Sequence, residues 1–151
     1  MGKSKSKRSV LIYIILVILI ISCKRTDTTE KSVIEIGERM FLTQIQDIRF
    51  NSNDFLGRTI RLEGIFTGIS WNEAFYYYVV RYASDGCCGG DNVGFEVMWP
   101  KNLIEQYPDN NSWVEATGVL KLLKDDIYRN LYLELVSLNV LDKRGAEFVW
   151  R

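Results

Sequence analysis

The seven residues from Asp85 to Asp91 hold the densest group of chemically reactive side chains in this sequence. Cys87 and Cys88 are adjacent, Asp85 and Asp91 enclose them, and three glycines fill the remaining positions. Thiolates are soft ligands and carboxylates are hard ones, so together they suit a soft metal or metalloid ion. Glycine also lets the backbone approach a ligand closely. The turn therefore predicts a binding site built from Cys87, Cys88, Asp91 and Asp85.

Zinc fits this turn poorly. Structural zinc sites take four ligands from spaced cysteine or histidine pairs, and this chain has no histidine. Zinc would need both carboxylates or a second molecule, whereas an ion with two or three ligands would be satisfied more readily.

Two other roles for the cysteine pair stay open. Thiols outside the cytoplasm tend to oxidise, and a disulfide between neighbouring residues closes a strained ring that is comparatively easy to reduce. The pair would then act as a redox-sensitive latch on the turn. Alternatively, Cys87 and Cys88 are small residues at the end of a strand, with one thiol packed inward as free cysteine commonly is.

Composition argues against several classes of function. Without histidine the chain lacks Ser-His-Asp and Cys-His catalysis as well as the commonest metal ligand. Asp85 and Asp91 have no nucleophile-and-base arrangement beside them except the thiols, which argues against a hydrolase. Removing the first 22 residues removes four of the 19 basic residues and none of the 19 acidic ones, so the net charge becomes −4. Nucleic acid is therefore not an expected partner, because its binding needs a basic surface.

Residues 1–22 are typical of a secretory signal peptide. Four basic residues precede the apolar run Val10–Ile21. As a helix this run would rise only about 18 Å, short of a hydrocarbon core of roughly 30 Å. Ser22 and Cys23 follow in a pattern that resembles the lipobox of bacterial lipoproteins. The resemblance implies that Cys23 carries acyl chains, palmitate among them, that hold it to a membrane of the cell envelope outside the cytoplasm. The open alternative is an uncleaved anchor, with Cys23 a chance thiol.

Residues 23–32 are predicted to be the lipidated cysteine and a polar tether, and residues 33–151 a single domain. Apolar side chains recur at helical spacing over Glu38–Arg49, which predicts an amphipathic helix. A second, short helix is predicted at Lys101–Tyr107. Elsewhere the apolar period is two, which predicts strands. The first strand begins at Thr59, and the others cover Phe75–Tyr82, Val93–Trp99, Val114–Leu122 and Tyr132–Leu141.

Five strands with a short helix between the third and the fourth predict a mainly β fold, a small OB-like Greek-key barrel, with a small sandwich as the alternative. Gly64 and Gly68 are expected bend points in the first strand. The apolar register of the last strand shifts after Leu135, which predicts a bulge. Closure would also remove sheet edges through which a chain this rich in β-formers would aggregate.

Arg81 lies within an otherwise apolar predicted strand, where a buried guanidinium needs a partner. Asp85 and Glu96 are the candidates, and a structural pair is favoured over contact with a ligand. Several aromatic side chains could stack an oligosaccharide or a base, although aromatics at a period of two more often belong to a core. They are Trp71, Tyr76–Tyr78, Tyr82 and Trp99.

From about Val33 to the C-terminus, the chain resembles the soluble C-terminal domain of the YcgQ-type bacterial envelope proteins. Cys87-Cys88-x-x-Asp91 is the most specific element of this resemblance. The family typically has small alanines where this chain has Gly89-Gly90, and a Pro-rich ending in place of Ala146–Trp150. Its function is unassigned, and its membrane-bound members are encoded beside a predicted permease, so the resemblance implies an envelope domain with a permease as the partner to expect. The other similar segments are Ile34–Ile36, Phe41–Ile48, Asp54–Gly57, Ile60–Gly64, Phe75–Arg81 and Trp113–Gly118.

These observations predict a lipid-anchored, non-enzymatic binding or accessory module of the bacterial cell envelope that assists a membrane transporter. Cys87 and Cys88 are the expected contact residues, with Asp85 and Asp91 in support. A thiol redox protein using the same cysteine pair is the alternative from another class.

Overall fold

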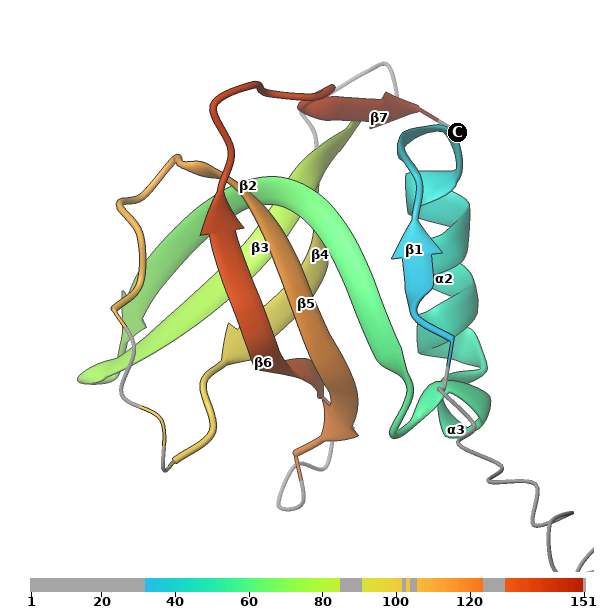
Figure 1. The fold of residues 1–151 in the computed structure, drawn as a ribbon, viewed down its shortest axis with the longest axis horizontal. Helices are drawn as coiled ribbons and strands as arrows, with labels where there is room; N and C mark the ends of the chain where they lie inside the picture. The colour runs from blue at the N-terminus through green and yellow to red at the C-terminus, as the bar shows by residue number, and fades with distance from the viewer. Residues whose placement is uncertain (1–31, 85–90, 102, 104–105, 124–129, 151) are drawn as a thin grey trace, which may run out of the picture. The chain divides into compact units, whose positions relative to one another are not determined.

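The computed structural model describes residues 32–84, 91–101, 103, 106–123 and 130–150, and Figure 1 shows its fold. The chain divides into two units, Met1–Glu30 and Lys31–Arg151, and every described residue belongs to the second. The predicted signal peptide, Cys23 and nearly all of the predicted tether lie outside the described residues. None of the helices in the described part of the chain combines the length and the apolar content that crossing a membrane requires.

A closed barrel of five strands forms the body of the domain. Its strands are β2 (Thr59–Trp71), β3 (Ala74–Ser84), β4 (Asp91–Met98), β5 (Trp113–Leu122) and β6 (Leu131–Val140). Around the barrel the order is β2, β5, β6, β4, β3 and back to β2. All of these neighbours are antiparallel except β4 and β6, which are parallel. This connectivity is OB-like, so the predicted fold class is confirmed.

Two short strands extend the sheet beyond the barrel. β1 (Ile34–Ile36) pairs in parallel with the first half of β2, and β7 (Phe148–Trp150) pairs in parallel with the end of β3. Both strands cover backbone edges that would otherwise be open to pairing with other chains.

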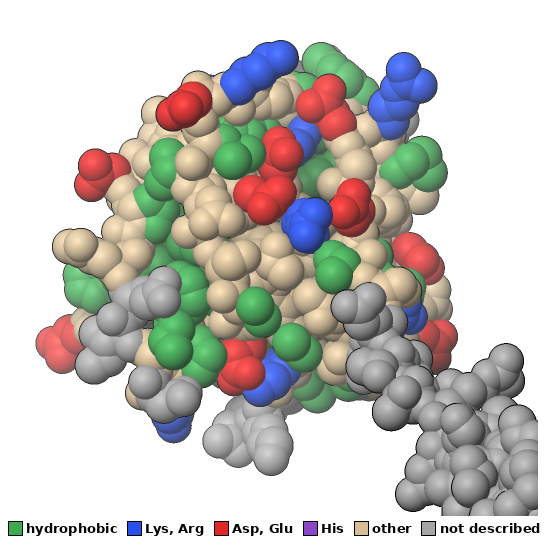
Figure 2. All heavy atoms as spheres, in the orientation of Figure 1, with side chains coloured by type: hydrophobic (Ala, Val, Ile, Leu, Met, Phe, Trp, Pro, Cys, Tyr) green, Lys and Arg blue, Asp and Glu red, His purple; other side chains and the backbone are tan. Residues whose placement is uncertain are grey.

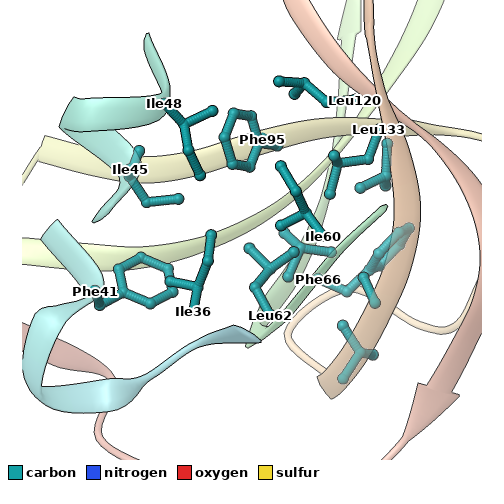
Figure 3. Close-up of a cluster of buried hydrophobic side chains, with 14 of the residues drawn as sticks. Ile36, Phe41, Ile45, Ile48, Ile60, Leu62, Phe66, Phe95, Leu120 and Leu133 are labelled. Atoms are coloured by element: carbon teal, nitrogen blue, oxygen red, sulfur yellow. The ribbon is translucent and has the colours of Figure 1, made fainter. Parts of the chain in front are cut away.

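A helical segment packs its apolar face into the barrel. The 3-10 turn η1 (Glu38–Met40) leads into α2 (Phe41–Phe50), and a short helix α3 (Ser52–Phe55) follows. The helix predicted at Glu38–Arg49 is thus observed. Its apolar side chains recur at helical spacing and point toward Phe95 and the interior of the barrel (Figure 3). The buried ones are Phe41, Leu42, Ile45 and Ile48.

The described residues between β4 and β5 contain no helix, in contrast to the one predicted at Lys101–Tyr107. The N–H of Leu103 donates to the carbonyl of Pro100 at 2.8 Å in a turn, and residues 102, 104 and 105 lie outside the described residues. Tyr107 stacks on Tyr77, with 3.8 Å between the ring centroids. The segment between β4 and β5 is therefore held against β3 by aromatic packing.

The structure tests the predicted bulge in β6 and shows how closely β3 approaches Gly64. Thr117 pairs with Ser137 and Gly118 pairs with Leu135, so Val136 is an extra residue in β6 and the predicted bulge is confirmed. At Gly64 an added Cβ would lie 2.7 Å from the carbonyl oxygen of Val80, so no side chain fits there without a shift of the backbone.

Candidate functional site

The cysteine turn that the sequence singles out connects β3 to β4. Asp85, Cys87 and Cys88 lie outside the described residues, whereas Asp91 is exposed and is the first residue of β4. Asp91 pairs with Ala83 across the two strands. Residues 84–90 therefore connect two positions that are direct neighbours in the sheet.

The end of β3 that leads into this turn is held on both sides. Tyr82 pairs with Asn92 of β4 and with Phe148 of β7. The rings of Tyr82 and Phe148 are 5.4 Å apart, and Val149 between the exposed aromatic residues of β7 is buried. The end of β3 before the cysteine segment is therefore paired on both sides.

Within the described ranges, no group of three or more His, Cys, Asp or Glu side chains could hold a metal ion. A metal at the turn would have to take its thiolates from residues 85–90. Asp91 is the described carboxylate next to them, and its exposure leaves it accessible to an ion from solvent.

Arg81 lies inside the barrel, and only 2% of its side chain is exposed. Its Nε donates to the carbonyl of Glu63 at 2.9 Å, and its Nη1 donates to that of Ala146 at 3.0 Å. The acidic partner is Glu38, with 3.4 Å between Nη1 and Oε2. This differs from the predicted partners, because Glu96 faces the outer side of the sheet and Asp85 lies outside the described residues.

Two aromatic rings enclose the Arg81 guanidinium, at 4.8 Å from the ring of Phe41 and 4.9 Å from that of Trp113. Burial lowers the pKa of Arg81 from its ordinary value, and the charge of Glu38 acts in the opposite direction. Because the guanidinium is bonded within the fold and covered on its faces, Arg81 is best explained as a structural cross-link, not as a ligand contact.

A hollow of about 330 Å³ adjoins this cross-link. Acidic and basic side chains gather on the face of the barrel that carries β2 and β5 (Figure 2). Glu35 and Arg61 form an ion pair at 3.0 Å there, in addition to the pair of Glu38 with Arg81. Both basic side chains among the described residues that line the hollow are thus already paired, Arg61 at the surface and Arg81 inside the barrel. Its lining carboxylates are Glu35, Glu38, Glu63 and Glu115.

A larger groove, of about 590 Å³, lies on the outer face of the barrel. Strands β2, β3 and β4 form its floor, and the end of α2 and the start of β6 form its sides. In OB barrels the face of the second and third strands, here β3 and β4, is the usual ligand-binding surface. The lining residues are Arg49, Phe50, Ser52, Thr67, Ile69, Tyr78, Val80, Asn92, Gly94, Glu96, Asn130 and Leu131.

Sequence reasoning missed this groove because its residues come from segments that are far apart in the chain. A partial signal was available in β4. Asn92, Gly94 and Glu96 alternate with the apolar residues Phe95 and Val97, and the latter two are buried. The alternation therefore places Asn92, Gly94 and Glu96 on the outer face of β4. It does not reveal that the end of α2 forms one side of a groove there.

The groove contains a cation, a carboxylate and a phenol. Arg49 donates from Nη2 to the carbonyl of Gly94 at 2.9 Å, and desolvation lowers its pKa from the ordinary value. Desolvation also raises the pKa of Tyr78, and the charge of Glu96 adds to this effect. Arginine stays charged at neutral pH in proteins, and the raised pKa of Tyr78 means that its hydroxyl keeps its proton and can donate a hydrogen bond.

The aromatic side chains that were candidates for stacking divide between the two faces of the sheet. Tyr77 faces inward and stacks on Phe66, with 5.7 Å between the ring centroids, so it belongs to the core. Trp99 is partly buried against the core. Trp71 is 67% exposed and continues the outer face beyond Ile69. Of the candidates, Trp71 is thus the one most accessible to a ligand in the groove.

The closed five-strand barrel, with a groove on the face of its second and third strands, defines this chain as a small OB-like domain protein. A family model described as the DUF1980 C-terminal domain matches residues 22–149, and the chain belongs to that family. A comparison with curated proteins finds no match.

Proposed function

We propose that this chain is a non-enzymatic binding module of the bacterial cell envelope, fastened to a membrane through a lipidated Cys23. Its ligand is a soft metal or metalloid ion held by Cys87 and Cys88, with Asp85 and Asp91 in support. The OB-like barrel supports this reading, because it is a fold that serves as a binding module in many settings.

The observation that carries the metal proposal is the position of Asp91. It is exposed at the base of the turn and pairs with Ala83 across the sheet. In the sequence it follows Cys88 by three residues and Cys87 by four. A carboxylate on a paired strand, so close in the sequence to two thiols, can supply a hard ligand to an ion that the thiols bind as soft ligands.

The partner that we propose is a membrane permease. This part rests on the resemblance to the YcgQ-type envelope proteins, and membership in the DUF1980 C-terminal domain family is consistent with it. An anchored module that holds an ion at the membrane surface would raise the local concentration of that ion beside a transporter.

Metal binding is tested on the full chain, purified under reducing conditions. The probes are Cu(I), arsenite and Zn(II), with bound ion measured per chain by elemental analysis after removal of excess. Cu(I) or arsenite is expected to bind stoichiometrically, and the Cys87→Ser and Cys88→Ser variants are expected to lose it. Cys23→Ser should keep the ion. Asp91→Asn should weaken binding, whereas Asp109→Asn, an exposed carboxylate in another turn, should not.

Each alternative has its own outcome in this experiment. A chain without metal but with a titratable intramolecular disulfide would identify a thiol redox protein. Variants that change neither metal content nor thiol titration would leave the cysteines with a packing role only.

Lipidation is tested by mass spectrometry of the mature chain. A chain that begins at Cys23 and carries acyl chains supports the anchor. An intact N-terminus, with no difference between the wild type and Cys23→Ser, would exclude it.

A further inference from the structure

The groove on the outer face of the barrel has the size and lining of a binding site for an extended ligand. Its volume of about 590 Å³ falls within the range of roughly 300–1,000 Å³ found for ligand pockets. Planar amides from Asn92 and Asn130 and hydroxyls from Thr67 and Tyr78 line it. These groups can donate and accept hydrogen bonds along an uncharged polar molecule.

Two exposed aromatic side chains lie in or next to the groove. Phe50, at the end of α2, lines the groove and is 85% exposed. Trp71 follows Ile69 by two residues on the same face of β2, about 7 Å farther along the strand. The hairpin turn beside Trp71 is tight, because Trp71 pairs directly with Ala74 and only two residues lie between them. These two residues, Asn72 and Glu73, both have positive φ, at 48° and 66°, as tight hairpin turns require. The indole is therefore held on a short, well-defined hairpin instead of a long loop.

The charge of the groove lining favours an uncharged ligand over nucleic acid. Among the described residues that line the groove, Arg49 is the one cation and Glu96 the one carboxylate. Nucleic acid needs a surplus of basic groups along its backbone, and this groove does not supply it.

An added peptide strand is also disfavoured. β2, β3 and β4 pair with one another along the floor of the groove. At the edge of β4, the carbonyl of Gly94 already accepts a hydrogen bond from Arg49. A peptide that binds as an extra strand needs free backbone groups of this kind.

We propose that this groove binds a neutral oligosaccharide. The sugar chain lies across the outer face of β2, β3 and β4, with its hydroxyls bonded to Asn92, Asn130 and Arg49 and one ring stacked on Trp71. Oligosaccharides are one of the two ligand classes that OB barrels take on this face, and the charge of the described lining residues disfavours the other. The site is distinct from the cysteine turn and does not depend on metal binding there.

The test is made on the full chain with the tetramers of N-acetylglucosamine, glucose in β-1,4 linkage and glucose in α-1,4 linkage as probes. Binding is followed by calorimetry and by tryptophan fluorescence. At least one tetramer is expected to bind saturably, and Trp71→Ala should weaken it about tenfold, the loss expected when one aromatic anchor is removed. Phe75→Ala is the matched control, because Phe75 is 68% exposed on the same hairpin but faces the other side of the sheet. It should change the affinity less than about twofold.

Three outcomes would overturn the proposal. The first is that none of the tetramers binds with a Kd below about 1 mM. The second is that Phe75→Ala weakens binding as much as Trp71→Ala. The third is that a neutral peptide or an oligonucleotide binds in the groove in place of the sugars. The Cys87→Ser, Cys88→Ser double variant should bind the sugar unchanged, so the two proposals fail independently.

Discussion

Two arginines of this domain, Arg81 and Arg49, are both desolvated, but they face opposite sides of the barrel wall. Arg81 points into the interior, where Glu38, two backbone carbonyls and two aromatic rings surround it. Arg49 borders the outer groove, and among the described residues the structure gives its guanidinium one acceptor, the carbonyl of Gly94. Desolvation lowers the pKa of both guanidinium groups, but the side chain of Arg49 is exposed, whereas that of Arg81 is 2% exposed, so burial already separates the two.

The hydrogen-bond partners of the two guanidinium groups agree with this difference in exposure. A guanidinium whose donors are used within the fold holds segments together, and its loss leaves buried acceptors without a donor. A guanidinium that keeps donors at the edge of a groove can bond a ligand at little cost to the fold. Arg81 belongs to the first kind, and we assign Arg49 to the second.

The largest effect is expected for Arg81→Met. The substitution removes the donor to the carbonyls of Glu63 and Ala146 and the cation between the rings of Phe41 and Trp113. We expect the free energy of unfolding to fall by about 2–4 kcal/mol, because two backbone carbonyls each lose the donor that satisfies them. Urea unfolding of the variant and the wild type measures this difference.

Arg61→Met is the control for that measurement, since Arg61 forms a surface ion pair with Glu35. Its cost should stay below about 1 kcal/mol. Equal losses for the two variants would show that the interior position of Arg81 is not what stabilises the fold.

Gly94→Ala tests the floor of the groove and is expected to have the next largest effect. An added Cβ would lie 2.0 Å from the carbonyl oxygen of Val79 and 2.8 Å from the Cα of Val80. The strands β3 and β4 must move apart to admit it, at an expected cost of about 1–3 kcal/mol.

Gly37→Ala is the matched control, because nothing lies within 4 Å of a Cβ added there. Urea unfolding should find it close to the wild type. A Gly94→Ala variant as stable as Gly37→Ala would mean that the close approach of β3 and β4 is not maintained in solution.

Much of the fold could be predicted because its signals are local. The period of two in the strands, the helical spacing of α2 and the register shift after Leu135 each arise from neighbouring residues. The helix predicted at Lys101–Tyr107 is not seen in the described residues of that segment. Tyr107 is positioned by its stack on Tyr77, a contact between distant segments that no local period encodes.

The candidate sites show the same limit. That Arg81 is buried and paired could be predicted from its apolar neighbours, but its partner Glu38 lies before the helix and was not foreseen. The groove could not be predicted, since Arg49 and Asn130 reach it only when the barrel closes. The cysteine turn could be proposed as a site from the sequence because all of its groups lie within seven consecutive residues, and it stays a prediction.

Arg49→Met should separate binding from stability. The variant loses one hydrogen bond, to Gly94, and keeps most of its apolar packing. We expect a cost of about 1 kcal/mol or less in urea unfolding and a loss of about tenfold in affinity for the oligosaccharide. A variant that is strongly destabilised, or that binds the sugar as well as the wild type, would place Arg49 in the same class as Arg81.

The smallest effect is expected for Glu38→Gln, and it depends on pH. The backbone N–H of Ala146 donates to Glu38 at 3.1 Å, and this bond does most to lower the pKa of the carboxyl from its ordinary value of 4.5. Desolvation opposes the shift, and the charge of Arg81 reinforces it. A carboxyl whose pKa is lower in the folded state adds stability above its unfolded pKa and loses it as the pH falls through the folded value. Glutamine can still accept the bond from Ala146, so the variant isolates the charge.

Urea unfolding at pH 7 should therefore find Glu38→Gln less stable than the wild type by less than about 1 kcal/mol, because Glu38 is largely exposed. The difference should shrink as the pH falls below 4.5 and vanish once the folded carboxyl is protonated. A difference that is the same at pH 7 and at acid pH would mean that the charge of Glu38 does not support Arg81. The buried guanidinium would then be stabilised by its backbone acceptors and by the rings of Phe41 and Trp113 alone.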